Sequence, residues 1–232
     1  MENSTIIRIK NLVKKFPVGK GEFTALNGVE MTVNKGEFAG LIGPSGSGKT
    51  TLLNIIGSLD IPSSGEAIVL GKPVSTLSAK EAAHLRKVNL GFIFQTFNLL
   101  AVHTVFENVE FPLLLLKYGS AERRKMVMDA LEWVGLTNKV KSKPPQLSGG
   151  ESQRVAIARA MVKKPVLVLA DEPTANLDAA NSHHILKTME TLNRELKTTF
   201  LFATHDDKVI NYLQRKIFLI DGRIEKEEII TR

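Results

Sequence analysis

The sequence predicts an α/β fold in which a mostly parallel sheet carries helices on both faces. Apolar segments of strand length alternate with helical patterns over the last third of the chain, as they do in such folds. The first third is also rich in strand patterns, whereas the middle third contains helix start signals and few strand signals. We therefore expect a sheet-containing core that begins with a β-rich part and has a helical insertion between its two halves.

The first third is read as strands joined by turns. The residues at 34–36 predict a turn, and Asn27-Gly28 predicts a hairpin turn. A helix is expected over Thr50–Leu59, and a short strand over Ala67–Leu70. The β-rich segments that precede them are Ile6–Ile9, Ala25–Val33 and Glu37–Ile42.

The middle third is expected to be mostly helical over residues 96–162, and strands return after it. Apolar residues at 185, 186, 189, 192 and 196 recur with helical spacing and predict an amphipathic helix between two of these strands. Three pairs have the capping-box spacing that begins a helix: Ser78 with Glu81, Thr104 with Glu107, and Ser148 with Glu151. The returning strands are Val166–Ala170, Phe200–Ala203 and Lys216–Ile220, the last followed by the hairpin signal Asp221-Gly222.

Length and composition exclude several classes of protein. The 232 residues suit one large domain or two small ones, and 43% hydrophobic with 24% charged residues is ordinary globular usage. No apolar run approaches the ~18 residues of a membrane helix, and the first residues lack the pattern of a secretory signal. The absence of cysteine excludes disulfides and thiolate metal sites. We expect a soluble, cytosolic chain. Its net charge of +7 favours contact with nucleic acid, an anionic membrane surface or nucleotide phosphates, and a solvated surface with a modest excess of lysine is the alternative.

Residues 43–50 form a motif with direct chemical meaning. They read Gly43-Pro44-Ser45-Gly46-Ser47-Gly48-Lys49-Thr50, which matches the P-loop pattern G-x-x-x-x-G-K-[ST] between an expected strand and an expected helix. Glycines let successive backbone N–H groups approach phosphate oxygens, and the helix N-terminus adds the positive end of its dipole. Lys49 can then reach the β- and γ-phosphates, while the Thr50 hydroxyl can ligate Mg²⁺. A glycine-rich turn that binds nothing is the alternative, and the strand and helix context disfavours it.

Two acidic residues end the expected strand Val166–Ala170. Asp171 and Glu172 stand at its carboxyl end, where ligands bind in open α/β sheets. Asp171 is placed to hold Mg²⁺, and Glu172 to polarise the water that attacks the γ-phosphate. Two solvated acids at a strand end are the alternative, which the presence of a P-loop disfavours.

A further motif resembles the signature of ATP-binding-cassette (ABC) ATPases: Leu147-Ser148-Gly149-Gly150-Glu151-Ser152-Gln153-Arg154. Other motifs of that family follow in order, since Gln95 resembles the Q-loop glutamine, residues 175–178 the D-loop, and His205 the switch histidine. Phe16 stands where the family stacks an aromatic ring on adenine, although an ordinary core phenylalanine is the alternative and Phe23 lies nearby. The resemblance extends from about residue 6 to residue 224, nearly the whole chain.

The resemblance implies a fold, a reaction and a set of site residues. The fold is a P-loop NTPase core with an antiparallel β subdomain and an inserted α-helical subdomain, in a single nucleotide-binding domain over residues 1–232. Residues 1–95 and 163–232 form the catalytic core with the β subdomain, and residues 96–162 form the helical subdomain. The reaction is ATP hydrolysis with Mg²⁺, and the catalytic residues implied are Glu172, His205 and Lys49. The residues implied in nucleotide binding are Phe16, Gly43, Pro44, Ser45, Gly46, Ser47, Gly48, Lys49, Thr50, Thr51, Gln95, Ser148, Gly149, Gly150 and Asp178, and those implied at Mg²⁺ are Thr50, Gln95 and Asp171.

Ser148 and the glycines after it have two interpretations, which can both hold. Ser148 with Glu151 forms a capping box, so it can be a plain helix N-cap. The N–H groups of Gly149 and Gly150 also make this helix start suitable for an anion. The family joins two chains head to tail, and the resemblance therefore implies that Ser148 of one chain faces the γ-phosphate held by the other.

The branch of the family is indicated by residues 95–100 and 104–114. They are similar to the lipoprotein-releasing and macrolide-export ATPases, which work with a separate membrane subunit. This similarity implies an ATP-dependent homodimer, peripheral on the cytoplasmic face of the inner membrane, that drives export or extraction of a substrate. The cell-division ABC ATPase, which regulates cell-wall hydrolysis through a membrane partner, has a similar Q-loop and stays an alternative. A nucleotide-gated scaffold without hydrolysis would lack Lys49 or Glu172, and both are present.

The similarity also implies a groove that receives a helix of the membrane subunit. The residues implied are Asn98, Leu99, Leu100 and Phe106, with simple core packing as the alternative for each. Nucleic acid is not expected as a partner, because only 6% aromatic residues supply a poor stacking platform for single strands.

Overall fold

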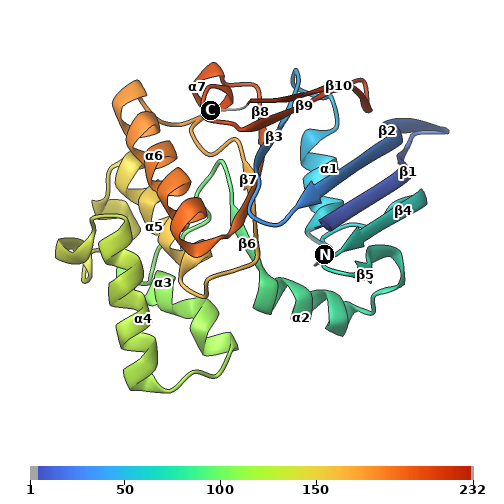
Figure 1. Cartoon of the computed structure of the whole chain (residues 1–232). Helices are drawn as coiled ribbons and strands as arrows, with labels where there is room; N and C mark the ends of the chain where they lie inside the picture. The colour runs from blue at the N-terminus through green and yellow to red at the C-terminus, as the bar shows by residue number, and fades with distance from the viewer. Residues whose placement is uncertain (1–4, 231–232) are drawn as a thin grey trace.

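The computed structural model describes residues 5–230, which form two β-sheets with helices between and around them (Figure 1). The larger sheet has six strands in the order β10-β9-β3-β8-β7-β6, in which β10 is antiparallel and the other five are parallel. Its strands are β3 (Phe38–Ile42), β6 (Leu90–Ile93), β7 (Leu167–Asp171), β8 (Thr199–Thr204), β9 (Arg215–Ile220) and β10 (Arg223–Ile229). The mostly parallel sheet predicted from the sequence is confirmed.

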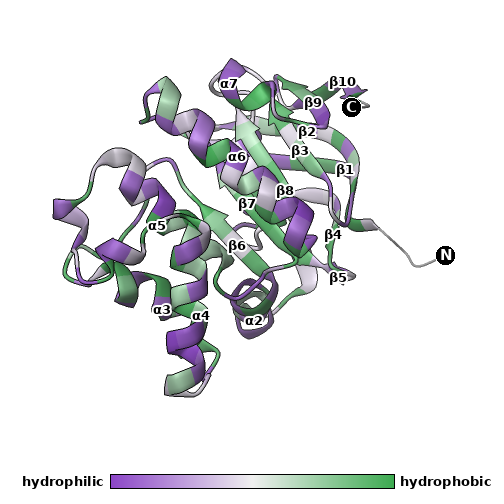
Figure 2. Cartoon of the chain, turned by 60° about the vertical axis from the view of Figure 1, so that its left-hand side comes forward, coloured by the Kyte–Doolittle hydropathy of each residue, from purple (hydrophilic) through white to green (hydrophobic). Residues whose placement is uncertain are grey.

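The central strands of this sheet are buried on both faces, as their unbroken apolar sequences indicate. Along β8, Phe200 and Phe202 enter one hydrophobic core, while Leu201 and Ala203 enter a second core on the opposite face. Figure 2 shows β6, β7 and β8 as hydrophobic ribbons enclosed by helices of mixed hydropathy. Side chains on both faces therefore fix the carboxyl ends of these strands, where the acidic residues stand.

The second sheet is antiparallel, in the order β2-β1-β4-β5. Its strands are β1 (Thr5–Val18), β2 (Gly21–Asn34), β4 (Ser64–Val69) and β5 (Lys72–Pro73). The prediction of a hairpin turn at Asn27-Gly28 is wrong, because β2 runs through both residues. Gly28 has a positive φ of 72°, the pairing register shifts there, and the Asn27 N–H bonds to the carbonyl of Gly222 (2.8 Å). Tertiary pairing thus converts a turn dipeptide into a β-bulge.

Helix α1 (Lys49–Ile56) lies between the two sheets (Figure 1). Leu52, Ile55 and Ile56 are fully buried in the core that it shares with both of them. The helix ends three residues before the predicted limit, and Leu59 is left exposed beyond it.

Three of the remaining helices, α2 (Ala79–Asn89), α3 (Val105–Leu115) and α5 (Gly149–Met161), begin where the capping boxes predict. Each of Ser78, Thr104 and Ser148 accepts the backbone N–H of the glutamate three residues later, and that glutamate accepts the cap residue's own N–H. The others are α4 (Ser120–Trp133), α6 (Ala179–Leu196) and α7 (Asp207–Ile210). Short 3₁₀ turns occur at Val74–Thr76, Thr137–Lys139 and Pro144–Gln146. Within residues 5–230, no helix combines the length and the hydropathy needed to cross a membrane.

Candidate active site

The P-loop joins β3 to α1 and presents an uncapped helix start. Gly48 precedes α1 with a φ of 99°, and no side chain caps the helix there. A Cβ on Gly48 would lie 2.6 Å from the carbonyl oxygen of Ala25, so only glycine fits this conformation and this contact. Gly46 also has a positive φ of 82° and faces open space. The first N–H groups of α1 are therefore free of a side-chain acceptor and suit an anion.

Lys49 is buried at the centre of this loop. Its Nζ donates to the carbonyl oxygens of Gly43 (2.7 Å) and Pro44 (2.9 Å), which holds the ammonium over the loop. Burial lowers the pKa of Lys49, and the charges of Glu172 and Asp171 oppose that shift. Ser47 is also buried, and its Oγ has no hydrogen-bond partner in the described part of the chain.

Thr50 and Asp171 meet across the end of the sheet. Thr50 Oγ1 donates to the two carboxylate oxygens of Asp171, at 2.9 and 3.2 Å. Burial raises the pKa of Asp171, and the hydrogen bond from Thr50 acts in the opposite direction. This pair supplies oxygen donors alone, and Mg²⁺ is bound through one or two carboxylates, hydroxyls and phosphates. The residues present therefore fit Mg²⁺.

Glu172 follows Asp171 in the chain, and two side chains contact its carboxylate. His205 Nδ1 lies 2.6 Å from Glu172 Oε1, and Thr204 Oγ1 donates to Glu172 Oε2 (3.0 Å). The Glu172 backbone has a φ of 45°, and its N–H bonds to the carbonyl of Ala203 (2.9 Å). A left-handed non-glycine residue is strained, and such strain gathers at functional sites.

One cavity of about 440 Å³ brings most of the predicted site residues together. Its lining includes P-loop residues 45, 46 and 48–50, the two acidic residues and both aromatic residues of the β1–β2 hairpin, whereas Gly43, Pro44 and Ser47 do not line it. Its lining residues are Phe16, Phe23, Ala25, Ser45, Gly46, Gly48, Lys49, Thr50, Thr51, Gln95, Asp171, Glu172 and His205. The arrangement supplies an anion-binding helix start, a cation and two carboxylates at one sheet edge.

The signature residues and Asp178 do not line this cavity. Ser148 and Gly149 are exposed at the start of α5, and Ser148 Oγ accepts the Glu151 N–H (3.2 Å). Asp178 caps α6 by accepting the N–H of Asn181 (2.8 Å), a hydrogen bond that lowers the pKa of its carboxyl. Within one chain these residues are therefore separate from the P-loop.

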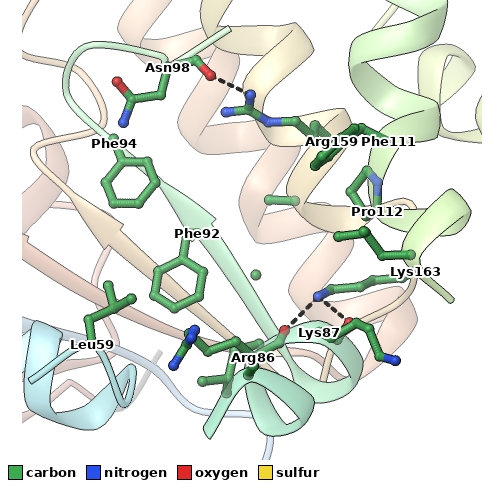
Figure 3. Close-up of a pocket in the computed structure, with 15 residues that line it drawn as sticks. Leu59, Arg86, Lys87, Phe92, Phe94, Asn98, Phe111, Pro112, Arg159 and Lys163 are labelled. Atoms are coloured by element: carbon green, nitrogen blue, oxygen red, sulfur yellow. Dashed lines mark hydrogen bonds between the residues drawn. The ribbon is translucent and has the colours of Figure 1, made fainter. Parts of the chain in front are cut away.

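A second cavity, of about 450 Å³, lies between α2, β6, α3 and α5 and is called the α3 groove below (Figure 3). Of the four residues predicted to form a partner groove, only Asn98 lines it. Leu99 and Phe106 pack against the hydrophobic core, and Leu100 is exposed outside the groove. The α3 groove is lined by Leu59, Ala83, Arg86, Lys87, Leu90, Gly91, Phe92, Phe94, Asn98, Phe111, Pro112, Leu115, Arg159, Ala160 and Lys163.

Sequence reasoning missed Phe111 and Leu115, which line the groove from α3. They are 45% and 51% exposed, whereas Val105, Val109 and Leu113 form the buried stripe of the same helix. A surface helix needs apolar residues on one face only. The surplus apolar residues over 111–116 were the signal that could have found them.

Comparisons with known proteins agree with this geometry. The family profile described as ABC transporter matches residues 26–175. YvrO of Bacillus subtilis (strain 168), described as an uncharacterized ABC transporter ATP-binding protein, is 44% identical over 225 residues, which cover 96% of this chain and 97% of that protein.

Similar solved structures are also described as ABC transporter proteins. The dimeric structure of MJ0796, described as a bacterial ABC transporter cassette, matches with a TM-score of 0.90 and 40% identity over 97% of this chain and 99% of that chain. A post-hydrolysis state of that cassette, bound to ADP and Pi, matches equally well. The structure of cbiO1 from Clostridium perfringens, part of the ABC transporter complex cbiONQ, matches with a TM-score of 0.88 and 31% identity over 98% of this chain and 89% of that chain. The chain therefore belongs to the ABC transporter family and is an ATPase of that family.

Proposed function

We propose that this ATPase is the subunit that drives export or extraction of a substrate, such as a lipoprotein, a macrolide or a peptide, through a separate membrane subunit. The observation that carries the chemical part is the Glu172 carboxylate, fixed by His205 and Thr204 beside the buried Lys49. The similarity of residues 95–100 and 104–114 to export ATPases supports the transport part.

Three residues of the cavity have roles that follow from their chemistry. Lys49 and the first N–H groups of α1 bind the phosphates, because both present positive charge to them. Glu172 polarises the water that attacks the γ-phosphate, and His205 contacts that phosphate and holds the water in place. The contact between His205 and Glu172 keeps the two groups at one sheet edge.

Thr50 and Asp171 are the residues that would hold Mg²⁺, together with Gln95 from the loop after β6. When bound, the ion offsets the negative charge of the β- and γ-phosphates. The burial that raises the pKa of Asp171 favours a cation beside this carboxylate.

We further propose a head-to-tail homodimer that forms when ATP is bound. Ser148 and Gly149 are exposed and lie outside the cavity of their own chain, as a partner-facing site requires. The MJ0796 cassette is described as dimeric, which supports the same arrangement here. Ser148 and the glycine N–H groups of one chain would then complete the phosphate site of the other.

The α3 groove is our proposed contact with the membrane subunit, and we propose that the chain is peripheral at the cytoplasmic face of the membrane. Much of the lining of the groove is apolar and includes Phe92, Phe94 and Phe111 (Figure 3). Arg86, Lys87, Arg159 and Lys163 also line it, and its described lining contains no acidic residue. The partner segment we expect is therefore a short amphipathic helix with an apolar face and at least one carboxylate.

Glu172→Gln tests the chemical part of this proposal. The variant keeps the size of the side chain but loses the negative charge that polarises water, so MgATP should bind normally while hydrolysis falls by about 100-fold or more. Calorimetric titration and phosphate release measure the two effects separately. Glu132→Gln, at an exposed position on α4, is the matched control and should hydrolyse ATP like the wild type. Wild-type turnover by Glu172→Gln would refute the assigned role.

A further inference from the structure

Two aromatic side chains open into the nucleotide cavity, and only Phe16 has a role so far. Phe16 and Phe23 are direct partners in the pairing of β1 with β2. Phe16 is 37% exposed and Phe23 is 54% exposed, and both line the cavity that contains the P-loop. Exposed apolar surface costs free energy in water, and a ligand that covers both rings would recover it.

A lysine occupies one face of the Phe16 ring. Lys14 Nζ lies 4.9 Å from the centre of that ring. The ammonium is fixed there by Asp60 Oδ1 (2.6 Å) and by the carbonyl of Ile61 (2.8 Å). One face of Phe16 is therefore left for a base, and the remaining stacking surface at this end of the cavity belongs to Phe23.

Phe23 is held at a fixed place relative to the phosphate-binding loop. Ala25, two residues along β2, has its carbonyl oxygen so close to Gly48 that a Cβ there would lie 2.6 Å away. The same carbonyl packs against Gly222, where a Cβ would also lie at 2.6 Å. These backbone contacts fix the position of Phe23 relative to the start of α1. One ligand can therefore contact both the Phe23 ring and the phosphate site.

We infer that Phe23 is a second base-contacting residue, which together with Phe16 holds the purine by its faces. The inference rests on the proposed binding of ATP in this cavity. The hairpin contributes Phe16, Phe23 and Ala25 to the lining, and all three are apolar. The polar lining residues come instead from the P-loop, from residue 95 and from the sheet edge. The base is therefore selected by the area of its π-face, which is larger in a purine than in a pyrimidine.

Calorimetric titration of the full chain with two ligands tests this inference. MgATP carries a base, and magnesium tripolyphosphate carries the same phosphate chain without one. Phe23→Ala should weaken MgATP binding by about fivefold or more, from the lower end of the range measured for base–aromatic stacking. Tripolyphosphate binding should stay within about twofold of the wild type, since the phosphate site is untouched.

Two further variants make the result decisive. Phe23→Trp keeps a π-face and should retain ATP binding, while Val18→Ala, at a 60% exposed position of the same hairpin outside the cavity lining, should change neither ligand. Equal losses of both ligands in Phe23→Ala would show a structural effect and overturn the inference, as would undiminished ATP binding. Failure of the wild type to bind ATP would overturn the proposed function instead.

Discussion

Glu172 has a backbone conformation that glycine would adopt more easily. Its φ of 45° costs about 1–3 kcal/mol for a residue with a Cβ, and it persists because the surrounding strands fix it. The N–H bond to the Ala203 carbonyl ties this turn to β8, the strand that leads to His205. This hydrogen bond helps to keep the carboxylate beside the histidine. The sequence could predict the carboxylate but not this conformation, because β8 and β7 are brought together only by the tertiary fold.

Folding moves the pKa of Lys163 toward neutral pH. Burial lowers its pKa to about 8. Its Nζ donates to the carbonyls of Arg86 (2.8 Å) and Lys87 (2.7 Å) near the end of α2. The position at the C-terminal end of a helix favours a cation, and the enclosed surroundings oppose it.

We expect the lowered pKa of Lys163 to make the free energy of unfolding depend on pH. Its pKa is lower in the folded chain than the ordinary 10.5, so the unfolded chain binds more protons between about pH 8 and pH 10.5. The burial of the protonated lysine lowers the free energy of unfolding below pH 8. This loss disappears as the pH rises through that window, because the unfolded chain then also loses its proton. We expect the free energy of unfolding of the wild type, relative to Lys163→Met, to rise by up to about 3 kcal/mol. Denaturant unfolding at several pH values measures it. Lys164→Met, at the exposed neighbour, should show no such trend, and a flat difference for Lys163→Met would contradict the prediction.

At the scale of elements, α5 holds the loop that follows β6. Arg159 donates from Nη2 to the carbonyl of Phe97 (2.7 Å) and from Nη1 to that of Asn98 (2.5 Å). Both loop residues have positive φ, at 59° and 50°. One planar guanidinium thus stabilises two consecutive left-handed residues, close to Gln95 in the nucleotide cavity.

Arg159→Lys tests whether the two hydrogen bonds, and not the positive charge alone, stabilise this loop. A lysine ammonium lacks the fork that serves two carbonyls, so we expect about 2 kcal/mol lower stability together with a reduced kcat. Chemical denaturation and steady-state ATP hydrolysis measure the two effects. Arg124→Lys, at an exposed position on α4, is the control. An unchanged kcat would show that the loop keeps its conformation without Arg159.

The elements also show what a sequence can predict. The starts of α2, α3 and α5 were predictable because a capping box involves residues only three positions apart. The hairpin at Asn27-Gly28 was mispredicted because both residues lie within the pairing of β2 with β1, and Asn27 also bonds to Gly222, far along the chain. The α3 groove escaped prediction for the same reason, since four separate elements meet to form it. The division at residues 96–162 stays a prediction, because those helices share one hydrophobic core with the sheet.

For the whole molecule, the exposed signature predicts a second chain. In the Glu172→Gln background, ATP should convert the monomer to a dimer visible by light scattering. Adding Ser148→Arg should abolish that dimer, because the long side chain would occupy the place of the opposing phosphate. Ser78→Arg alters an equivalent helix cap on α2 and should leave the dimer intact. A dimer that forms without nucleotide would count against the proposed arrangement.

The α3 groove predicts a separate effect on the membrane subunit. Phe111→Asp should leave stability and basal hydrolysis nearly unchanged, because this residue is exposed on α3. Stimulation by the membrane subunit should be lost, since the substitution removes a phenyl ring from the apolar contact and adds a charge that repels the carboxylate expected on the partner segment. Val102→Asp, at a 77% exposed position outside the groove, is the matched control. A large fall in melting temperature would show that Phe111 belongs to the core instead.

Helix α5 bonds to segments next to the nucleotide cavity and also lines the α3 groove, and this has a consequence for when the cavity and the groove change shape. Gln153 Nε2 donates to the carbonyl of Pro173 (2.7 Å), directly after Glu172, and Arg159 holds the loop beyond Gln95. Ser148 begins the helix, and Ala160 lines the α3 groove near its end. Because one helix of 13 residues makes all of these contacts, a displacement of α5 would change them together. The nucleotide cavity and the α3 groove should therefore change shape at the same moment, in one cooperative event with a single rate.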